Sequence, residues 1–248
     1  MPREARVVSH PVVSIVGLTL ALLGAALASG EEPPNKLSLG FSYLATSGNS
    51  SSQTAGLDLA FKHRFDPWGI EASANFLRAQ QAGTLSAKKL FLGVRGTRNL
   101  TADLDLFLEG SYLQDRFAGL DPRLVGAGGV TYKYLKGPEH ELAFDVGLTW
   151  TKDELVGGGS SSYIGALAAA RYGWNISKTA KLTESLSFFP SFKESSNWRV
   201  ESQTGLQAAV STAVAVKLTY GFRYANRPVP GFRKTDTQTA ASLVVNLL

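Results

Sequence analysis

Residues suited to acid–base or nucleophilic chemistry are scarce in this chain. Beyond residue 28 it has two histidines, His63 and His140, and no cysteine occurs anywhere. Nucleophilic catalysis needs a nucleophile, a base within hydrogen-bond reach and a group that orients the base. Both histidines fall beside predicted turns, and neither has a lipase-type serine motif around it. The sequence therefore predicts no catalytic residue, and an envelope hydrolase is the least favoured function.

Metal and phosphate binding are also poorly supported. The acids of the predicted loops, Asp115, Asp121, Asp153 and Glu154, do not have the spacing of a calcium loop. Without cysteine there is no thiolate metal site. The glycine-rich stretches at 93–96 and 126–129 fall inside predicted strands, where glycine indicates a bend or close packing. We expect neither a metal nor a cofactor.

Charged residues at alternate positions suggest an electrostatic role instead. Asp103, Asp105 and Glu109 are spaced to share one face of a strand, because successive strand side chains point to opposite faces. They could pair with basic residues of neighbouring strands, such as Arg123, and fill the interior of a barrel. Alternatively, they could form a charged lining that biases which ions pass.

The same alternation gives the full set of candidate lumen charges. These are Glu71, Lys89, Arg95, Asp103, Asp105, Glu109, Lys133, Asp145, Arg171, Lys217 and Arg223. Because both signs are present, the set predicts no strong preference for anions or cations.

These side chains need long strands to position them. Alternation of apolar and polar residues is plainest at the end of the chain, where 213–224 and 236–248 flank a proline-bearing loop, 225–235. Similar stretches recur from residue 37 onward and predict about twelve strands. Soluble strands usually run about 5–6 residues, whereas a tilted membrane-spanning strand needs about 9–11.

The connections between the predicted strands form two classes. Those after the odd-numbered strands, including 80–85, 115–122 and 152–161, are mostly longer than the others. Bacterial outer-membrane barrels have an even strand count, short periplasmic turns and longer external loops. The one apolar-face residue that breaks the pattern is Glu184, which would lie near an interface or follow a bulge. A soluble secreted β-domain would show the same alternation and is the alternative.

The beginning of the chain predicts export. Arg3 and Arg6 precede an apolar stretch, 12–28, that closes on small residues, as in a cleaved secretory signal peptide. A permanent helical anchor is the alternative. We therefore predict a signal peptide at 1–28, a short lead at 29–36 and a transmembrane antiparallel β-barrel at 37–248. The formal net charge of +5 includes no basic block of the kind that binds nucleic acid.

Three segments carry a resemblance to a known family. They are "TSGNSS" at 46–51, "QDRFAGLDPR" at 114–123 and "YANRPVPGFRKTDTQ" at 224–238. In order and spacing they resemble the YdiY-like family of outer-membrane proteins described as salt-induced, over roughly 36–248. The resemblance implies a barrel without an established activity. The chain departs from many outer-membrane barrels at Leu248, where those end in an aromatic residue.

The sequence thus predicts a protein of the Gram-negative outer membrane, with membrane lipid and the barrel assembly machinery as partners. The leading function is a narrow passive pore for ions or small solutes, or a structural envelope protein. The alternative is a binding or adhesion surface formed by the external loops. Twelve strands lie between filled eight-stranded barrels and open sixteen-stranded porins, so strand number does not decide whether the lumen is open.

Overall fold

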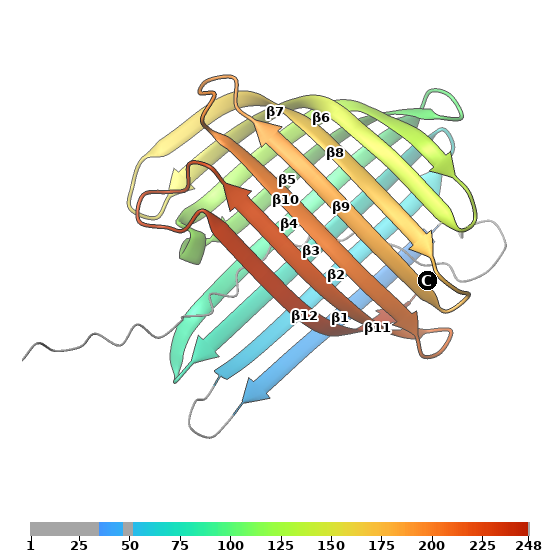
Figure 1. The fold of residues 1–248 in the computed structure, drawn as a ribbon, viewed down its shortest axis with the longest axis horizontal. Coiled ribbons are helices and arrows are strands. Elements are labelled where there is room, and N and C mark those ends of the chain that lie inside the picture. Colours follow the sequence, from blue (N-terminus) through green and yellow to red (C-terminus); the bar gives the residue numbers. More distant parts are fainter. Residues whose placement is uncertain (1–34, 47–51, 248) are drawn as a thin grey trace, which may run out of the picture.

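The protein folds as one closed antiparallel sheet. The computed structural model describes residues 35–46 and 52–247, whose strands follow chain order around the barrel until β12 pairs with β1 (Figure 1). This confirms the predicted all-β barrel of twelve strands. The predicted signal peptide, 1–28, lies outside the described residues, and the first strand begins at Asn35, inside the predicted lead.

The strands are long throughout. Their bounds are β1 Asn35–Thr46, β2 Ser52–Phe65, β3 Trp68–Gln81, β4 Thr84–Asn99, β5 Leu104–Asp115, β6 Leu120–Lys136, β7 His140–Leu155, β8 Ser160–Asn175, β9 Ala180–Pro190, β10 Trp198–Ala209, β11 Val214–Ala225 and β12 Thr235–Asn246. A short 3-10 helix, η1 (Arg116–Ala118), separates β5 from β6. In the described part of the chain, no helix is long and apolar enough to cross a membrane.

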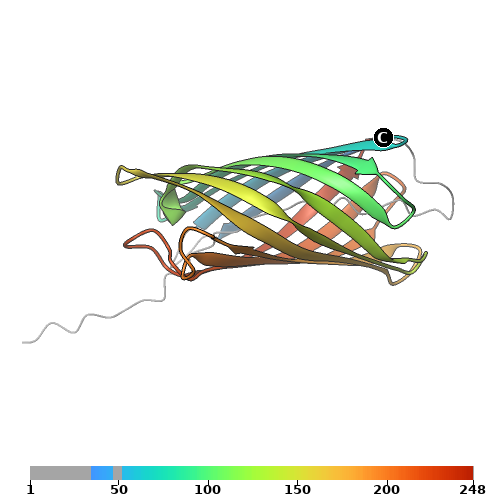
Figure 2. The same ribbon diagram turned by 90° about the horizontal axis from the view of Figure 1, so that it is seen from above.

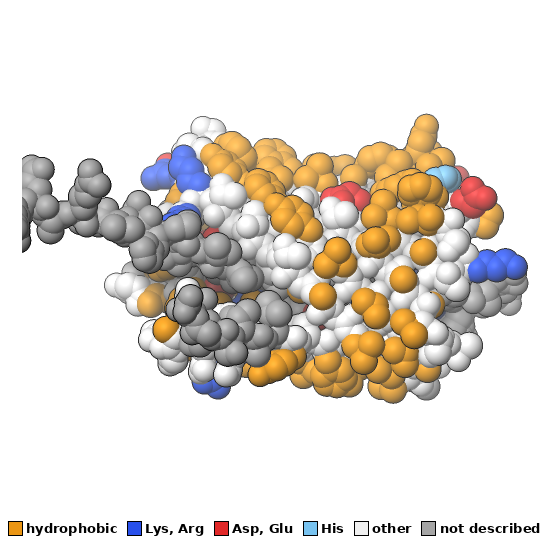
Figure 3. Space-filling model, turned by 60° about the horizontal axis from the view of Figure 1, so that its bottom comes forward, with side chains coloured by type: hydrophobic (Ala, Val, Ile, Leu, Met, Phe, Trp, Pro, Cys, Tyr) orange, Lys and Arg blue, Asp and Glu red, His pale blue; other side chains and the backbone are white. Residues whose placement is uncertain are grey.

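The predicted alternation sorts side chains between the two faces of the wall. On β11, Leu218 and Tyr220 are 50% and 47% exposed, whereas Ala215 and Arg223 are 1% and 6% exposed. The exposed set is apolar and the buried set includes charged residues, so the apolar face points outward. Figure 3 shows hydrophobic side chains over the outer wall and Lys and Arg side chains at its two ends.

The two ends of the barrel differ in their connections. At one end, here called the termini end, β1 begins and β12 finishes, and the turns span 66–67, 100–103, 137–139, 176–179 and 210–213. At the opposite end, the loop end, the described connections span 82–83, 116–119, 156–159, 191–197 and 226–234.

Several loop-end connections are shorter than predicted. The loop expected at 80–85 is a two-residue turn, with positive φ at both Ala82 (49°) and Gly83 (78°), as the type I′ hairpin geometry requires. The loop expected at 152–161 is reduced to 156–159, because β7 and β8 continue pairing as far as Glu154 and Ser160. Among the described connections, the predicted difference between the two ends therefore holds for 191–197 and 226–234 alone.

Three termini-end turns close with the same hydrogen bond. The hydroxyl oxygens of Thr101, Ser177 and Ser211 each accept from the backbone N–H three residues later, at 3.1 Å. Short polar side chains compete well for backbone donors at such positions. Each hydroxyl thus provides a hydrogen-bond acceptor for the first backbone N–H group of the following strand.

The barrel is flattened, and its closing seam is short. It is broad in Figure 1 and narrow in the view turned by 90° in Figure 2. β1 and β12 pair over four residue pairs, from Ser38–Asn246 to Phe41–Leu243, and then diverge toward the loop end (Figure 1). The flattening brings side chains of opposite walls within reach of one another.

Strands β6 and β7 approach each other most closely at a pair of glycines. Gly129 lies opposite Gly147, and a Cβ on Gly129 would stand 2.1 Å from the Val146 carbonyl oxygen. By contrast, a Cβ on Gly126 of the same strand would meet nothing within 4 Å.

We expect Gly129→Ala to lower the free energy of unfolding by about 1–3 kcal/mol, because the methyl group forces the two backbones apart. Gly126→Ala is the matched control and should leave stability nearly unchanged. Urea titration of the refolded barrel, followed by tryptophan fluorescence, measures both. Equal midpoints for the two variants would show that the close approach does not exist.

Candidate functional site

The inner face of the barrel carries the candidate site, since most predicted lumen charges lie there. The structure places ten of the eleven on the face opposite the exposed apolar residues: Glu71, Lys89, Arg95, Asp105, Glu109, Lys133, Asp145, Arg171, Lys217 and Arg223. Asp103 is the exception. Its predicted place on the strand is wrong, because β5 begins at Leu104 and Asp103 ends the preceding turn. There its side chain is 52% exposed and pairs with Lys136.

An ion-pair network centred on Asp145 joins five consecutive strands, β4 to β8, on the inner face of the barrel. Asp145 is 3% exposed, and its Oδ1 accepts from Arg171 Nη2 (2.9 Å), Arg95 Nη2 (3.1 Å) and Thr131 Oγ1 (2.6 Å). Arg95 also donates from Nη1 to Glu109 at 2.7 Å. Since Arg95 is on β4 and Asp145 on β7, this network extends beyond one strand pair.

Further ion pairs lie on both sides of this network. Toward the termini end, Lys133 Nζ lies 2.7 Å from Asp105 Oδ1. Toward the loop end, Arg123 binds both carboxylate oxygens of Asp153 at 2.6 and 2.8 Å, the bidentate geometry that makes strong arginine–carboxylate pairs.

The termini end of the lumen is hollow. A cavity of about 500 Å³, the termini-end cavity, is lined by residues of eight strands and of the turns between them. Its charged lining comes from Lys62, Arg64, Asp66, Glu71, Arg95, Asp105, Lys133, Lys136, Glu141, Arg171 and Lys181. Charges of both signs surround it, as the sequence predicted.

A second cavity lies deeper in the lumen. It measures about 120 Å³, and five arginines contribute to its lining, so it is called the arginine cavity here. It shares Glu71, Arg95 and Arg171 with the termini-end cavity. These three side chains therefore stand at the boundary between the two spaces.

Apolar side chains narrow the lumen around these cavities. Phe107, Ala127 and Leu167 form a buried cluster with Ala169 and Phe189 packed against it. The guanidinium carbons of Arg95 and Arg199 lie 4.0 and 3.9 Å from the ring centroids of Phe107 and Phe189. Contacts of this kind hold the cation over the negative face of the ring.

The loop end is closed by a second apolar cluster, here called the mouth cluster. It comprises Phe91, Leu113, Leu120, Leu155 and Val229. The first four come from β4 to β7, whereas Val229 comes from the β11–β12 connection, which starts on the opposite side of the barrel. That connection therefore crosses the mouth.

Gly119 provides the space for this crossing. Its φ is +80°, and a Cβ there would stand 2.7 Å from the Phe232 ring and 2.9 Å from Val229 Cβ. In Figure 1 the β11–β12 connection accordingly lies beside η1. Asn226 Nδ2 also donates to the Ser196 carbonyl oxygen at 2.8 Å, which ties the two longest described connections together.

Both histidines stand on the outward-facing parity of their strands near the termini end, and His63 is also among the residues that line the termini-end cavity. His63 faces outward on β2 and hydrogen-bonds Asn35 Oδ1. His140 begins β7, rather than lying in the predicted turn; its Nδ1 is 2.8 Å from the Tyr172 hydroxyl and its ring stacks on Trp174. Within the described ranges, no group of three His, Cys, Asp or Glu residues is arranged to hold a metal.

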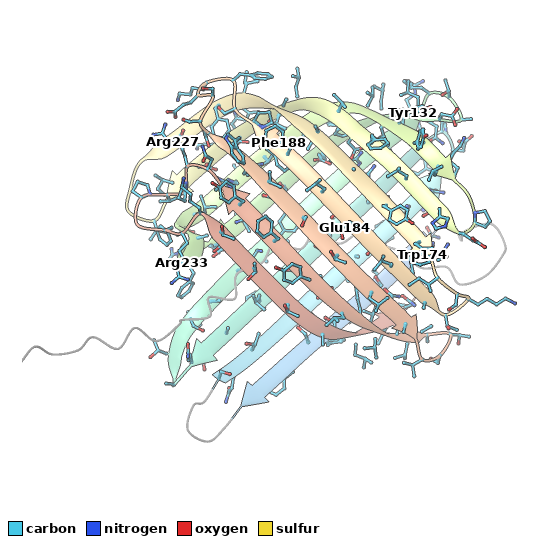
Figure 4. All side chains as sticks on the ribbon, viewed as in Figure 1. Tyr132, Trp174, Glu184, Phe188, Arg227 and Arg233 are labelled. Carbon is cyan, nitrogen blue, oxygen red and sulfur yellow. The ribbon has the colours of Figure 1, made fainter. Side chains whose placement is uncertain are left out.

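Glu184 is an acid on the outer wall. It pairs in register with Tyr172 and Thr204, and neither strand pair of β9 shows a register shift, so no bulge accounts for it. Thr204 donates a hydrogen bond to its carboxylate. Figure 4 places it on the wall between Phe188 of β9, toward the loop end, and Trp174 of β8, toward the termini end.

Sequence reasoning missed the residues of the arginine cavity that lie nearest the loop end. Arg199 and Glu201 stand on the polar parity of β10, but were not among the candidate lumen charges. Phe107 was also missed. It lies on the polar parity of β5, and an aromatic side chain on that parity indicates that the interior is partly filled. Alternation could have found all three.

Comparisons with known proteins agree with this architecture. The model of the family described as "Protein of unknown function, DUF481" matches residues 39–247. The chain belongs to this family. The relative described as "Uncharacterized protein YdiY" from Escherichia coli (strain K12) is 28% identical over 213 residues, which cover 85% of this chain and 82% of that protein. The predicted YdiY-like resemblance is thereby confirmed.

Two solved structures share the barrel fold of this DUF481 member. The NanC porin has a TM-score of 0.50 at 10% identity, covering 85% of this chain and 97% of that one. The COG4313 outer membrane channel from Pseudomonas putida F1 has a TM-score of 0.52 at 11% identity, covering 92% and 100%. At such identity the likeness shows the fold alone.

We expect Asp145→Asn to destabilise the barrel by about 3 kcal/mol, because it leaves two buried guanidinium groups without their shared counter-charge. Asp103→Asn removes one exposed partner at the rim and should cost less than about 1 kcal/mol. Urea unfolding midpoints measured side by side test the difference. Equal losses would show that the Asp145 network does not hold the strands together.

Proposed function

We propose that this protein is an outer-membrane barrel, exported by a cleaved signal peptide at 1–28, that passes ions or small solutes through a narrow lumen. The observation that carries the proposal is a pair of neighbouring cavities inside the barrel. The termini-end cavity and the arginine cavity share three lining residues, and the mouth cluster lies at the far end. A barrel with only a structural role has no need of such a chamber.

The outer surface supports the membrane part of the proposal. The shortest strands have 11 residues and the longest has 17, whereas a tilted membrane-spanning strand needs about 9–11. Exposed apolar side chains cover the outer face of every strand, for example Leu108 (72%), Val146 and Leu148 (61% each). In water such a surface would be an unfavourable exposed patch, whereas in lipid it is the expected solvent-facing surface.

Aromatic side chains mark the expected edges of that surface. Tyr132, Tyr134 and Trp174 are exposed near the termini end, and Trp198 and Tyr224 stack near the loop end. Such residues favour the interface between hydrocarbon and water. In this orientation the termini end faces the periplasm and the loop end faces outward.

The alternative function, a binding surface built by external loops, has less support. Three of the described loop-end connections are four residues or shorter, at 82–83, 116–119 and 156–159. The longest, 226–234, packs Val229 into the mouth cluster. Its apolar residues thus contribute to closing the lumen.

The experiment is single-channel recording in planar bilayers. We expect small steps from the wild type and severalfold larger steps from Val229→Ser combined with Phe232→Ser, because this pair removes apolar contacts that close the mouth. Arg233→Ser changes an exposed residue of the same connection and serves as the control.

Two results would contradict the proposal. Silence of both proteins at high load would mean that the lumen does not conduct. Equal steps from the double variant and the wild type would mean that the β11–β12 connection does not restrict the path.

A further inference from the structure

The arginine cavity has an excess of positive charge. Eight strands contribute to its lining, which includes five arginines and three glutamates: Arg95, Arg123, Arg171, Arg199, Arg223, Glu71, Glu109 and Glu201. A small enclosed space with more cations than carboxylates favours an anion, since low-dielectric walls strengthen the attraction.

Three of the arginines are largely neutralised by carboxylates. Arg123 is held bidentately by Asp153. Arg95 and Arg171 share Asp145, and Arg95 also binds Glu109. The positive excess is therefore not located on these three groups.

The excess lies on Arg199 and Arg223, which share one carboxylate. Their Nε atoms lie 3.3 and 3.6 Å from the same oxygen, Glu201 Oε1. Neither Nε makes a hydrogen bond within the described structure, although each residue is only 6% exposed. Buried donors without acceptors are costly, and a second carboxylate-like group would satisfy them.

Other charges lie beside this pair on the loop-end side. Lys89 is 2% exposed, its Nζ makes no hydrogen bond within the described part of the chain, and it interacts electrostatically with Arg223, Asp115 and Asp236. Lys89, Asp115 and Asp236 are not part of the cavity lining, whereas Arg223 is. The first three extend the charged layer toward the mouth, where Asp115 and Asp236 attract Arg223 and Lys89 repels it.

The cavity has a size that suits a small solute. A water molecule needs roughly 10–15 Å³ of such space, so 120 Å³ corresponds to a compact molecule of several heavy atoms. Glu71, Arg95 and Arg171 separate the arginine cavity from the termini-end cavity, and Phe91 and Leu113 of the mouth cluster line its other side.

We infer that the arginine cavity is a binding site for a small oxyanion, with Arg199 and Arg223 as the groups that bind its carboxylate or phosphate oxygens. Guanidinium groups suit this task because their paired N–H donors match two oxygens of such a group. That the cavity binds an oxyanion is inferred from the cavity alone. That this binding is a step in solute passage rests on the proposed function.

Titration calorimetry of the detergent-solubilised full barrel tests the site without requiring conduction. The probes are succinate, inorganic phosphate and neutral succinamide. We expect one of the two anions to bind and succinamide to give no heat; the anion that binds distinguishes a carboxylate from a phosphate ligand.

The matched variants are Arg199→Gln combined with Arg223→Gln, and Arg233→Gln as a control at an exposed arginine. The double variant should bind the anion at least about tenfold more weakly, which corresponds to losing roughly one charge-assisted hydrogen bond. Heat-modifiable gel migration verifies that each variant is folded. Absence of binding by the wild type, or unchanged binding by the folded double variant, would overturn the inference.

Bilayer recordings separate this inference from the proposed function. Conductance with no anion binding in calorimetry would overturn the oxyanion site and leave the pore intact. Anion binding with no conductance would support the site and overturn the pore.

Discussion

The closure of the sheet is the constraint on which the rest of the structure depends. In lipid, every backbone N–H and C=O group of a spanning segment must find a partner within the protein, and only a closed barrel achieves this with strands. Here the closure depends on β12 reaching β1, which it does over four residue pairs, from Ser38–Asn246 to Phe41–Leu243. Once the sheet is closed, strict alternation decides which side chains face outward and which face one another inside.

Closure into a flattened barrel explains how the interior is organised. The flattened cross-section lets Arg95 of β4 reach Asp145 of β7, three strands away, and lets Val229 reach the mouth cluster. Burying each of these charges alone would cost free energy, and pairing them inside the barrel reduces that cost. The cavities are the space in the lumen that the paired side chains do not fill. The same arrangement places the Nε atoms of Arg199 and Arg223 beside one carboxylate oxygen, that of Glu201.

Alternation in the sequence was sufficient to predict the strand number and to group ten of the eleven candidate lumen charges on one face, whereas strand length, strand count and the two loop classes were needed to predict that this face points inward. The prediction placed Asp103 on a strand because this residue continues the polar parity of Asp105 and Glu109. In the structure, however, the register pairs of β5 with β6 begin at Leu104. Alternation could not predict the pairs between strands that are not neighbours, such as Arg95–Asp145, because these depend on the barrel's cross-section and not on sequence spacing. The path of the β11–β12 connection across the mouth, which brings Val229 to the mouth cluster, depends on the same cross-section.

The central claim is that this alternation separates a lipid-facing surface from a polar interior. The chain has no cysteine, so single cysteines carrying a spin label can be introduced along β11 at positions 215 to 220. In lipid vesicles, we expect collisions with oxygen to be frequent at Val216, Leu218 and Tyr220 and rare at Ala215, Lys217 and Thr219. Frequent collisions of a water-soluble nickel chelate with the first three positions would contradict the account.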